Sequence, residues 1–186
     1  GRNTYGQLGD GSLQSRATPT RVLGITGARA IAAGTNGAAA IHLDGRVFTW
    51  GGSESGQLGT GGTTAATSAA EVPPIADARQ LVSGTHHVLA LDRTTRMWAW
   101  GSNTYGKLGL GEGSNSPSLV PERSDLSGAM GAAAHEFHTL VMMPDGTVRG
   151  LGANGGRLGN NDTASTVLSV PVSGLTLGNN TWLTTD

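Results

Sequence analysis

The sequence contains no cysteine, which excludes disulfide cross-links and thiolate metal ligands in every compartment. Charge is also scarce: 13% of the 186 residues are Asp, Glu, Lys or Arg, the formal net charge is −1, and Lys107 is the only lysine. A protein that binds nucleic acid usually carries a basic arm or stripe. We therefore expect no nucleic-acid partner.

Long apolar runs are missing as well. No stretch approaches the roughly 20 residues that a helix needs to span a bilayer, so no membrane span is predicted. Aromatic residues make up 4% of the chain, but 37% of its residues are hydrophobic. That hydrophobic fraction, with so little charge, predicts a globular chain and not a disordered one.

Glycine is abundant, with 31 residues, and it marks an internal repeat. A short Gly-x-Leu-Gly element begins at Gly6, Gly56, Gly106 and Gly156, a spacing of 50 residues. A period of this size makes each copy one supersecondary unit, and stacked copies bury a shared core. We divide the single array 1–186 into units 1–50, 51–100 and 101–151 and a partial unit, 152–186.

The apolar segments of each unit are four to six residues long, which is the length of strands. Asp44-Gly45 and Asp145-Gly146 lie between apolar runs and predict two-residue hairpins with positive φ at both central residues. Thr94-Thr95 takes this place in the second unit, where we expect a different turn geometry.

Four short antiparallel strands in each unit are typical of a β-propeller blade. We predict an all-β fold of about three and a half to four blades, each a four-stranded antiparallel sheet, and a β-solenoid is the alternative. The leucine of the Gly-x-Leu-Gly element should pack between neighbouring units, and Trp50, Trp98 and Trp100 should belong to blade packing and not to a sugar site.

Two segments resemble catalytic motifs. Gly101–Lys107 has the spacing of a phosphate-binding loop, but Leu108 follows where Ser or Thr would hold magnesium. His135–His138 is one residue shorter than the zinc motif His-Glu-x-x-His and joins two strands, so we expect His138, like His87, to make a hydrogen bond within its blade. No nucleophile elbow is present. We predict no catalytic residue, no metal, no cofactor and no enzymatic activity.

Three segments together resemble the regulator of chromosome condensation (RCC1) repeat: Gly84-Thr85-His86-His87, Asp44-Gly45-Arg46-Val47-Phe48-Thr49-Trp50-Gly51 and Tyr105-Gly106-Lys107-Leu108-Gly109. The resemblance covers essentially the whole chain. It departs at Gly37, where the other copies have histidine, at His135, which replaces a glycine, and at Gly150-Leu151, which replaces the aromatic segment.

This resemblance implies a closed propeller, typically of seven blades, of which this chain would form roughly half. An open half would expose strand edges and an apolar blade face. The chain is then a fragment of a longer propeller, or two copies complete a ring, or another protein covers an open array. We favour the first two.

Propellers bind through the loops on their faces. The loops that differ between copies supply the candidate binding residues Asn36, His86, Glu136 and Phe137. The resemblance implies a protein-binding scaffold, since relatives act as exchange factors for small GTPases, chromatin adaptors or inhibitors of secreted enzymes. The near-neutral charge argues against the chromatin role.

The alternative is an extracellular bacterial module with a surface, adhesive or structural role, which recognises glycans or assembles with itself. Richness in Gly, Ala, Thr and Ser, with almost no Lys, favours it and an extracellular or cell-surface location. The partner is therefore another protein or a second copy of this chain.

Overall fold

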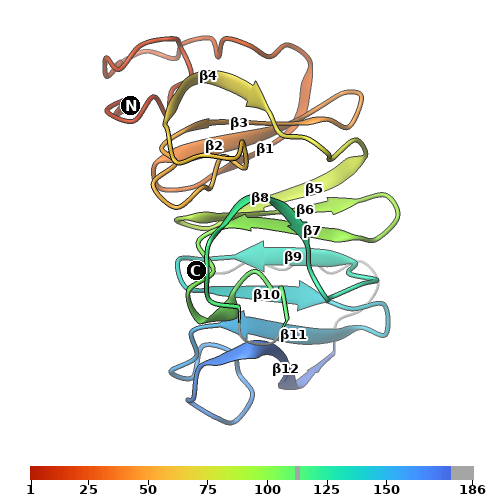
Figure 1. Ribbon diagram of the computed structural model, residues 1–186. Coiled ribbons are helices and arrows are strands. Elements are labelled where there is room, and N and C mark those ends of the chain that lie inside the picture. The colour runs from red at the N-terminus through yellow and green to blue at the C-terminus, as the bar shows by residue number, and fades with distance from the viewer. Residues whose placement is uncertain (112–113, 177–186) are drawn as a thin grey trace.

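The computed structural model describes residues 1–111 and 114–176. Within these residues the chain forms three four-stranded antiparallel sheets that are stacked one on another (Figure 1), and one short 3-10 helix, η1 (Thr104–Gly106). No helix in these ranges is long and apolar enough to cross a membrane. The sheets are propeller blades, and the predicted all-β partial propeller is confirmed.

Each sheet follows the order of the chain, so every connection joins neighbouring strands. The first sheet contains β1 (Ala28–Ala33), β2 (Gly37–His42), β3 (Val47–Gly51) and β4 (Ala66–Glu71). The second contains β5 (Ala78–Ser83), β6 (His87–Asp92), β7 (Met97–Gly101) and β8 (Ser118–Arg123). The third contains β9 (Gly131–Ala134), β10 (His138–Met142), β11 (Thr147–Gly152) and β12 (Thr166–Thr176).

The sheets are offset from the sequence units. The tryptophan strands β3 and β7, which end the units in sequence, are third strands, and the chain returns after the Gly-x-Leu-Gly loop to add β4 and β8 at their free edges. This return satisfies backbone groups that would otherwise form an open edge. Residues 19–22 occupy the corresponding position ahead of the first sheet and form no strand. In the third sheet the returning strand is β12, which begins at Thr166.

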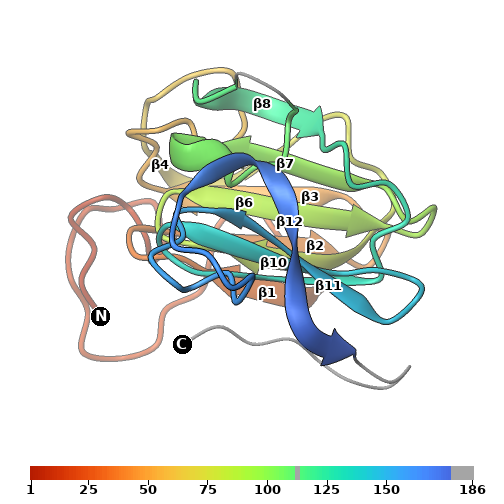
Figure 2. The ribbon, with the colours of Figure 1, turned by 90° about the horizontal axis from the view of Figure 1, so that it is seen from below.

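The first strands β1, β5 and β9 lie side by side at the contacts between sheets. The view along the stack shows the three sheets superposed, with β12 crossing in front (Figure 2). A propeller arranges its blades in this way, with first strands innermost and fourth strands at the periphery.

The hairpin turns differ from the prediction. At the first turn the N–H of Gly45 donates to the carbonyl of His42, and the N–H of His42 donates to the carbonyl of Arg46, both at 2.9 Å. This is a three-residue loop in which the glycine alone adopts positive φ, 91° for Gly45 and 79° for Gly146. The expectation of two residues with positive φ was wrong.

The Thr94-Thr95 turn has the same geometry as the other two. The N–H of Thr95 donates to the carbonyl of Asp92 at 3.2 Å, and Thr95 has a φ of 63°, in the left-handed region. The Asp92 carboxylate accepts hydrogen bonds from the N–H groups of Thr94 (2.8 Å) and Arg96 (3.0 Å). These bonds hold the turn that we expected to change, so that expectation was also wrong.

Two apolar clusters fill the spaces between the sheets. One lies between the first and second sheets and includes Ile41, Val47, Leu81 and Trp100; the other lies between the second and third. The leucine of the third Gly-x-Leu-Gly loop, Leu108, is fully buried in the second cluster, as predicted for a residue packed between units. Burying apolar side chains of this kind stabilises the stack by roughly 25 cal/mol per Å².

Tryptophan rings attach each of the first two sheets to the loop before it. The indole Nε1–H of Trp50 donates to the carbonyl of Gln7 (3.1 Å), and that of Trp100 donates to the carbonyl of Gln57 (2.9 Å). These residues recur as packing positions, which agrees with their predicted role in the blades.

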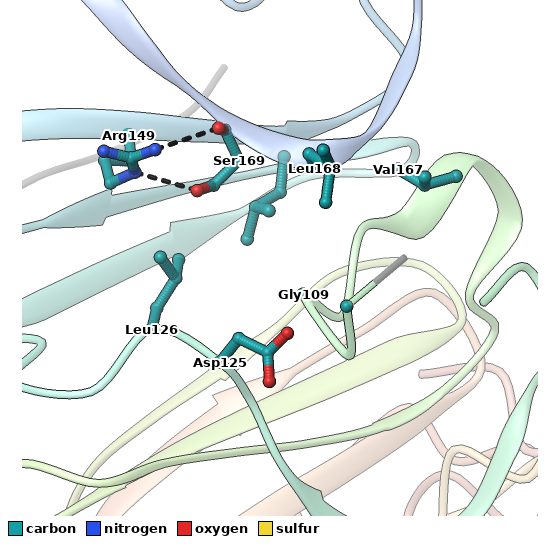
Figure 3. Close-up of a pocket in the computed structure, with 9 residues that line it drawn as sticks. Gly109, Asp125, Leu126, Arg149, Val167, Leu168 and Ser169 are labelled. Atoms are coloured by element: carbon teal, nitrogen blue, oxygen red, sulfur yellow. Dashed lines mark hydrogen bonds between the residues drawn. The ribbon is translucent and has the colours of Figure 1, made fainter. Parts of the chain in front are cut away.

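The third sheet has Leu151 in the place of the tryptophan, and the interface changes accordingly. The equivalent loop carbonyl, that of Lys107, accepts instead from the hydroxyl of Thr139 at 2.9 Å. Leucine is smaller than tryptophan, and a cavity of about 220 Å³ remains between the second and third sheets (Figure 3).

Candidate functional site

The loops between the first and second strands of the three sheets gather at one end of the stack. They are Gly34–Asn36, Gly84–His86 and His135–Phe137, and we refer to them together as the loop face. The hydroxyl oxygens of Thr35 and Thr85, from neighbouring sheets, lie 3.3 Å apart. All three loops line one concavity of about 280 Å³. The three variable loops therefore lie together on one face of the stack.

The four predicted residues take different positions on the loop face. Glu136 lines the concavity, Phe137 is 40% exposed, and Asn36 and His86 are half-buried beside it. The prediction had not selected the other side chains that line it, which are those of Ala33, Thr35, Ser83, Thr85, Ala134 and His135. Thr35 and Thr85 recur at the repeat period of 50, so their pairing was visible in the sequence.

Backbone carbonyls fix each loop to its own sheet. Those of Asn36 and His86 accept hydrogen bonds from Gly52 and Ser102 at 2.7 Å, and that of Phe137 accepts from Ala153 at 2.9 Å. The loops are short and held at both ends, which limits their motion and preorganises their side chains.

The buried side chain of Lys107 contacts the third loop of the loop face. Its side chain is buried, 2% exposed, and its Nζ donates to the carbonyl of Glu136 at 3.2 Å and lies 6.0 Å from the Phe137 ring centre. Burial lowers the pKa of Lys107. The lysine of the phosphate-loop-like segment therefore contacts the third loop of this chain, which agrees with the structural interpretation of that segment.

His87 bonds between sheets, and not within its blade as predicted. Its Nε2 lies 3.1 Å from the hydroxyl of Thr139, which itself donates to the carbonyl of Lys107, so the hydroxyl accepts from Nε2–H. Burial lowers the pKa of His87 to about 3, which keeps the ring neutral. The prediction failed because the partner comes from the next repeat, 52 residues along the chain.

His135 and His138, the histidines of the zinc-like segment, have ring centres 5.7 Å apart. Burial lowers the pKa of His138. In the ranges that the structure describes, no group of three or more His, Cys, Asp or Glu side chains could hold a metal ion. His135 lines the concavity, and the buried His138 packs beside it. The Nδ1 of His138 has no hydrogen-bond partner among the described residues, so the bond expected within its blade is not found.

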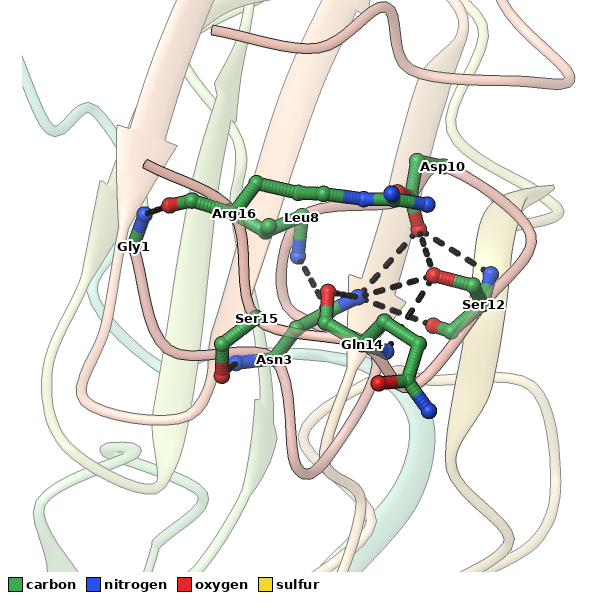
Figure 4. A network of polar contacts seen from close by, with 8 residues as sticks. All are labelled: Gly1, Asn3, Leu8, Asp10, Ser12, Gln14, Ser15 and Arg16. Carbon is green, nitrogen blue, oxygen red and sulfur yellow. Dashed lines mark hydrogen bonds and ion pairs between the residues drawn. The ribbon is translucent and has the colours of Figure 1, made fainter. Parts of the chain in front are cut away.

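Buried asparagines organise the Gly-x-Leu-Gly loops, and the sequence analysis missed them. Asn3 accepts from the N–H of Leu8 (2.9 Å) through Oδ1 and donates through Nδ2 to the carbonyls of Ser12 (2.9 Å) and Gln14 (3.1 Å), as Figure 4 shows. Asn103 and Asn154 accept in the same way from Leu108 and Leu158. Their recurrence near the repeat period was the available signal.

The second loop has Ser53 in place of asparagine, and its hydroxyl donates to the carbonyl of Gly62 at 3.1 Å. In the first loop the side chain of Ser12 donates to Asp10 and, with Arg16, lowers the pKa of that carboxyl to about 2. These networks stabilise the long loops that carry the Gly-x-Leu-Gly element.

The concavity on the loop face is lined by three hydroxyls, an imidazole and a carboxylate, supported by backbone held in place. Such a set can donate and accept several hydrogen bonds to a polar surface. It has no hydrophobic lining of the kind that encloses a small molecule. Chemically it suits recognition of another macromolecular surface.

The family profile of the regulator of chromosome condensation (RCC1) repeat matches residues 1–41, 44–91 and 96–142. A second profile of the same repeat matches residues 28–57 and 78–107. No curated protein matches the chain. The three segments of the first profile cover most of the chain and include all three loops of the loop face.

Solved structures share the fold. Human WBSCR16 is 20% identical with a TM-score of 0.77, and the match covers 91% of this chain and 45% of that one. Yeast RCC1 (Prp20), solved bound to Kap60, is 19% identical with a TM-score of 0.79, covering 93% and 43%. Prp20p from Saccharomyces cerevisiae is 18% identical with a TM-score of 0.74, covering 82% and 40%. The chain spans less than half the length of these structures, and it belongs to the RCC1 repeat family.

Proposed function

We propose that this chain is a non-catalytic propeller module that binds another protein through the loop face. The observation that carries the proposal is the convergence of three loops, one from each sheet, on a single concavity. Loops on a rigid scaffold are where propellers and other repeat proteins place their binding residues.

The contrast between frame and loops supports this assignment. The leucine and the glycines of the Gly-x-Leu-Gly element recur in all four copies, and the asparagine recurs in three, because packing and the loop hydrogen bonds require them. The residues of the loop face differ: Asn36, His86 and Phe137 occupy the same position in three copies. Variation on a constant frame is how a repeat array makes a specific surface.

Known binding by a structural neighbour agrees with a protein partner. Prp20p is described with its binding properties to Gsp1p and histones, and its yeast RCC1 structure holds Kap60. The formal net charge of the present chain, −1, favours neither a polyanion nor a strongly acidic partner. Our proposal for this chain is protein binding, without exchange activity.

The test compares two double variants at opposite ends of the sheets. His86→Ala with Glu136→Ala alters the loop face, and Leu43→Ala with Arg93→Ala alters the turns at the other end of β2 and β6. A protein recovered with the wild-type chain from its own cells is purified, and its affinity for all three chains is measured by calorimetry.

We expect the loop-face pair to weaken binding at least tenfold, because two polar contacts to a partner are worth about that much. The control pair should bind within twofold of wild type. Equal affinities for wild type and the loop-face pair, or an equal loss in both pairs, would exclude the loop face as the binding surface.

A further inference from the structure

The cavity between the second and third sheets lies where the other interface holds aromatic rings. In β7, Trp98 and Trp100 face the first sheet and pack on the apolar cluster there. The strand pairing gives their equivalents in β11: Trp98 and Trp100 pair with Ala90 and Val88, as Arg149 and Leu151 pair with Val141 and Thr139. Two rings have therefore been replaced by an arginine and a leucine.

The wall opposite the missing ring has kept its shape. A Cβ added to Gly59 would lie 2.8 Å from the indole Nε1 of Trp100, so that ring requires glycine at this position. At the third interface Gly109 has a φ of 66°, and an added Cβ would lie 2.7 Å from the hydroxyl of Ser124 and 3.2 Å from Leu151, so glycine is required there without a ring. Gly109 therefore adds no side chain to the space that the missing ring would fill.

The cavity is lined by apolar side chains on most sides. Its lining includes Leu151 and the three residues Leu126, Val167 and Leu168 that are labelled in Figure 3. Its volume of about 220 Å³ exceeds the roughly 150 Å³ of an apolar cavity that holds benzene. A two-ring aromatic such as indole therefore has room.

The polar groups at the cavity indicate the charge of the ligand. The guanidinium of Arg149 is held by Ser169, with Nε 2.8 Å from its hydroxyl and Nη2 3.0 Å from its carbonyl. Asp125 is exposed at the rim, and among the described residues its carboxylate has no cationic partner within 4.0 Å. Arg149 keeps its own positive charge, because Ser169 is neutral, but Figure 3 shows it across the cavity from Asp125. A positively charged group of the ligand placed at the rim would therefore complement Asp125.

We propose that this cavity is a binding site for a small aromatic amine about the size of indole, with its ring between Gly109 and Leu168 and its ammonium at Asp125. The site is separate from the loop face and does not depend on the protein-binding proposal. Burial of the ring supplies most of the affinity, and the rim carboxylate selects a cation over a neutral or anionic analogue.

The experiment titrates the chain with tryptamine, indole and indole-3-acetate, and follows the methyl NMR signals of Leu126, Val167 and Leu168. We expect tryptamine to shift these signals with a Kd between about 10 μM and 1 mM, the range for a ligand of this size. Indole should bind more weakly, and indole-3-acetate most weakly of the three.

Two variants separate ring from charge. Leu151→Trp should fill the cavity and weaken the binding of tryptamine at least tenfold. If the Leu151→Trp chain does not fold, Leu151→Phe is used instead. Asp125→Asn should weaken the binding of tryptamine about two- to fivefold, since an exposed ion pair contributes little more than that. The affinity for indole, which has no ammonium group, should be unchanged.

Leu13→Trp is the matched control, because it adds an indole at an exposed leucine (55% exposed) elsewhere on the chain. It should bind tryptamine as wild type does. Two results would overturn the proposal. The first is that none of the three compounds shifts a methyl signal at about 5 mM, a concentration above the expected Kd. The second is that a folded Leu151→Trp or Leu151→Phe chain binds tryptamine as tightly as wild type does.

Discussion

At the scale of single residues, a neutral histidine connects two blades. His87 is fully buried, and its bond to Thr139 belongs to a short chain of bonds that ends on the carbonyl of Lys107. In the other interface an indole N–H satisfies the equivalent carbonyl, that of Gln57. Loss of the indole at Leu151 is thus compensated by a hydroxyl from β10, because a buried carbonyl without a partner costs about 1–3 kcal/mol.

The buried histidine predicts how stability depends on pH. Its folded pKa of about 3 lies below the ordinary value of 6.5, so between these limits the unfolded chain binds a proton that the folded chain does not. Stability should therefore fall as pH decreases from 6.5 to 4.5, by at most about 1.4 kcal/mol per pH unit from this residue. His138, whose pKa is also lowered by burial, acts in the same direction.

Urea unfolding at several pH values checks this prediction. The carboxyl of Asp10, with a pKa of about 2, titrates outside this pH window, and its contribution is lost only at lower pH. The variant His87→Gln should give a flatter dependence between pH 6.5 and 4.5 than wild type. Identical slopes in the two chains would show that His87 is not responsible.

At the scale of the element, the three hairpin turns reach one geometry from different sequences. Asp44 and Asp145 cap their turns by accepting from the N–H two residues later, both at 3.0 Å, and each is followed by glycine. In the second turn the aspartate that accepts this bond, Asp92, lies two residues earlier in the turn than Asp44 and Asp145 do. Thr95 takes the place of the glycine and adopts the left-handed region. A β-branched residue is strained there.

Replacing Thr95 by glycine should relieve that strain. We expect Thr95→Gly to raise the free energy of unfolding by about 0.5–1 kcal/mol. This is the cost of placing a residue with a Cβ in the left-handed region, reduced by the larger conformational entropy that glycine loses on folding. Thermal unfolding followed by circular dichroism measures it. The reverse change, Gly45→Thr, should destabilise the chain, because its Cβ would also lie 2.8 Å from the carbonyl oxygen of Ala76. A loss of stability in Thr95→Gly would contradict this account.

At the scale of the whole molecule, the first sheet exposes one face. The corresponding faces of the second and third sheets are each covered by the preceding sheet. Ile31 is 79% exposed, whereas its equivalents Leu81 and Ala132, which lie against the preceding sheet, are 9% and 2% exposed. Only the position of the sheet in the stack distinguishes these three residues. An apolar face of this kind favours association with another blade, from a longer chain or from a second copy.

We expect this chain to self-associate through that face. Light scattering across a range of concentrations should give a mass that rises above the 18.8 kDa of one chain. Ile31→Asp should return the mass to one chain without loss of stability, because the side chain is exposed in the single copy. A wild-type mass that stays at one chain at every concentration would exclude this interface.

Prediction from sequence reached furthest where a feature repeats. The period of Gly6, Gly56 and Gly106 was sufficient for the blade architecture, and the variable positions were sufficient to select one face. It failed where the partner of a residue lies in another repeat. The bond of His87 to Thr139 and the lining role of His135 depend on how one sheet sits on the next, and no spacing within a unit encodes that.

The sequence by itself determined the repeat, the strand lengths and the positions of the glycines, because each of these follows from local backbone preference and a fixed period. Tertiary structure alone decided which unit completes which sheet, which threonine replaces a missing indole, and where a cavity remains. These depend on the volumes and hydrogen-bonding groups of side chains from two different repeats, and such groups meet only when the sheets have stacked.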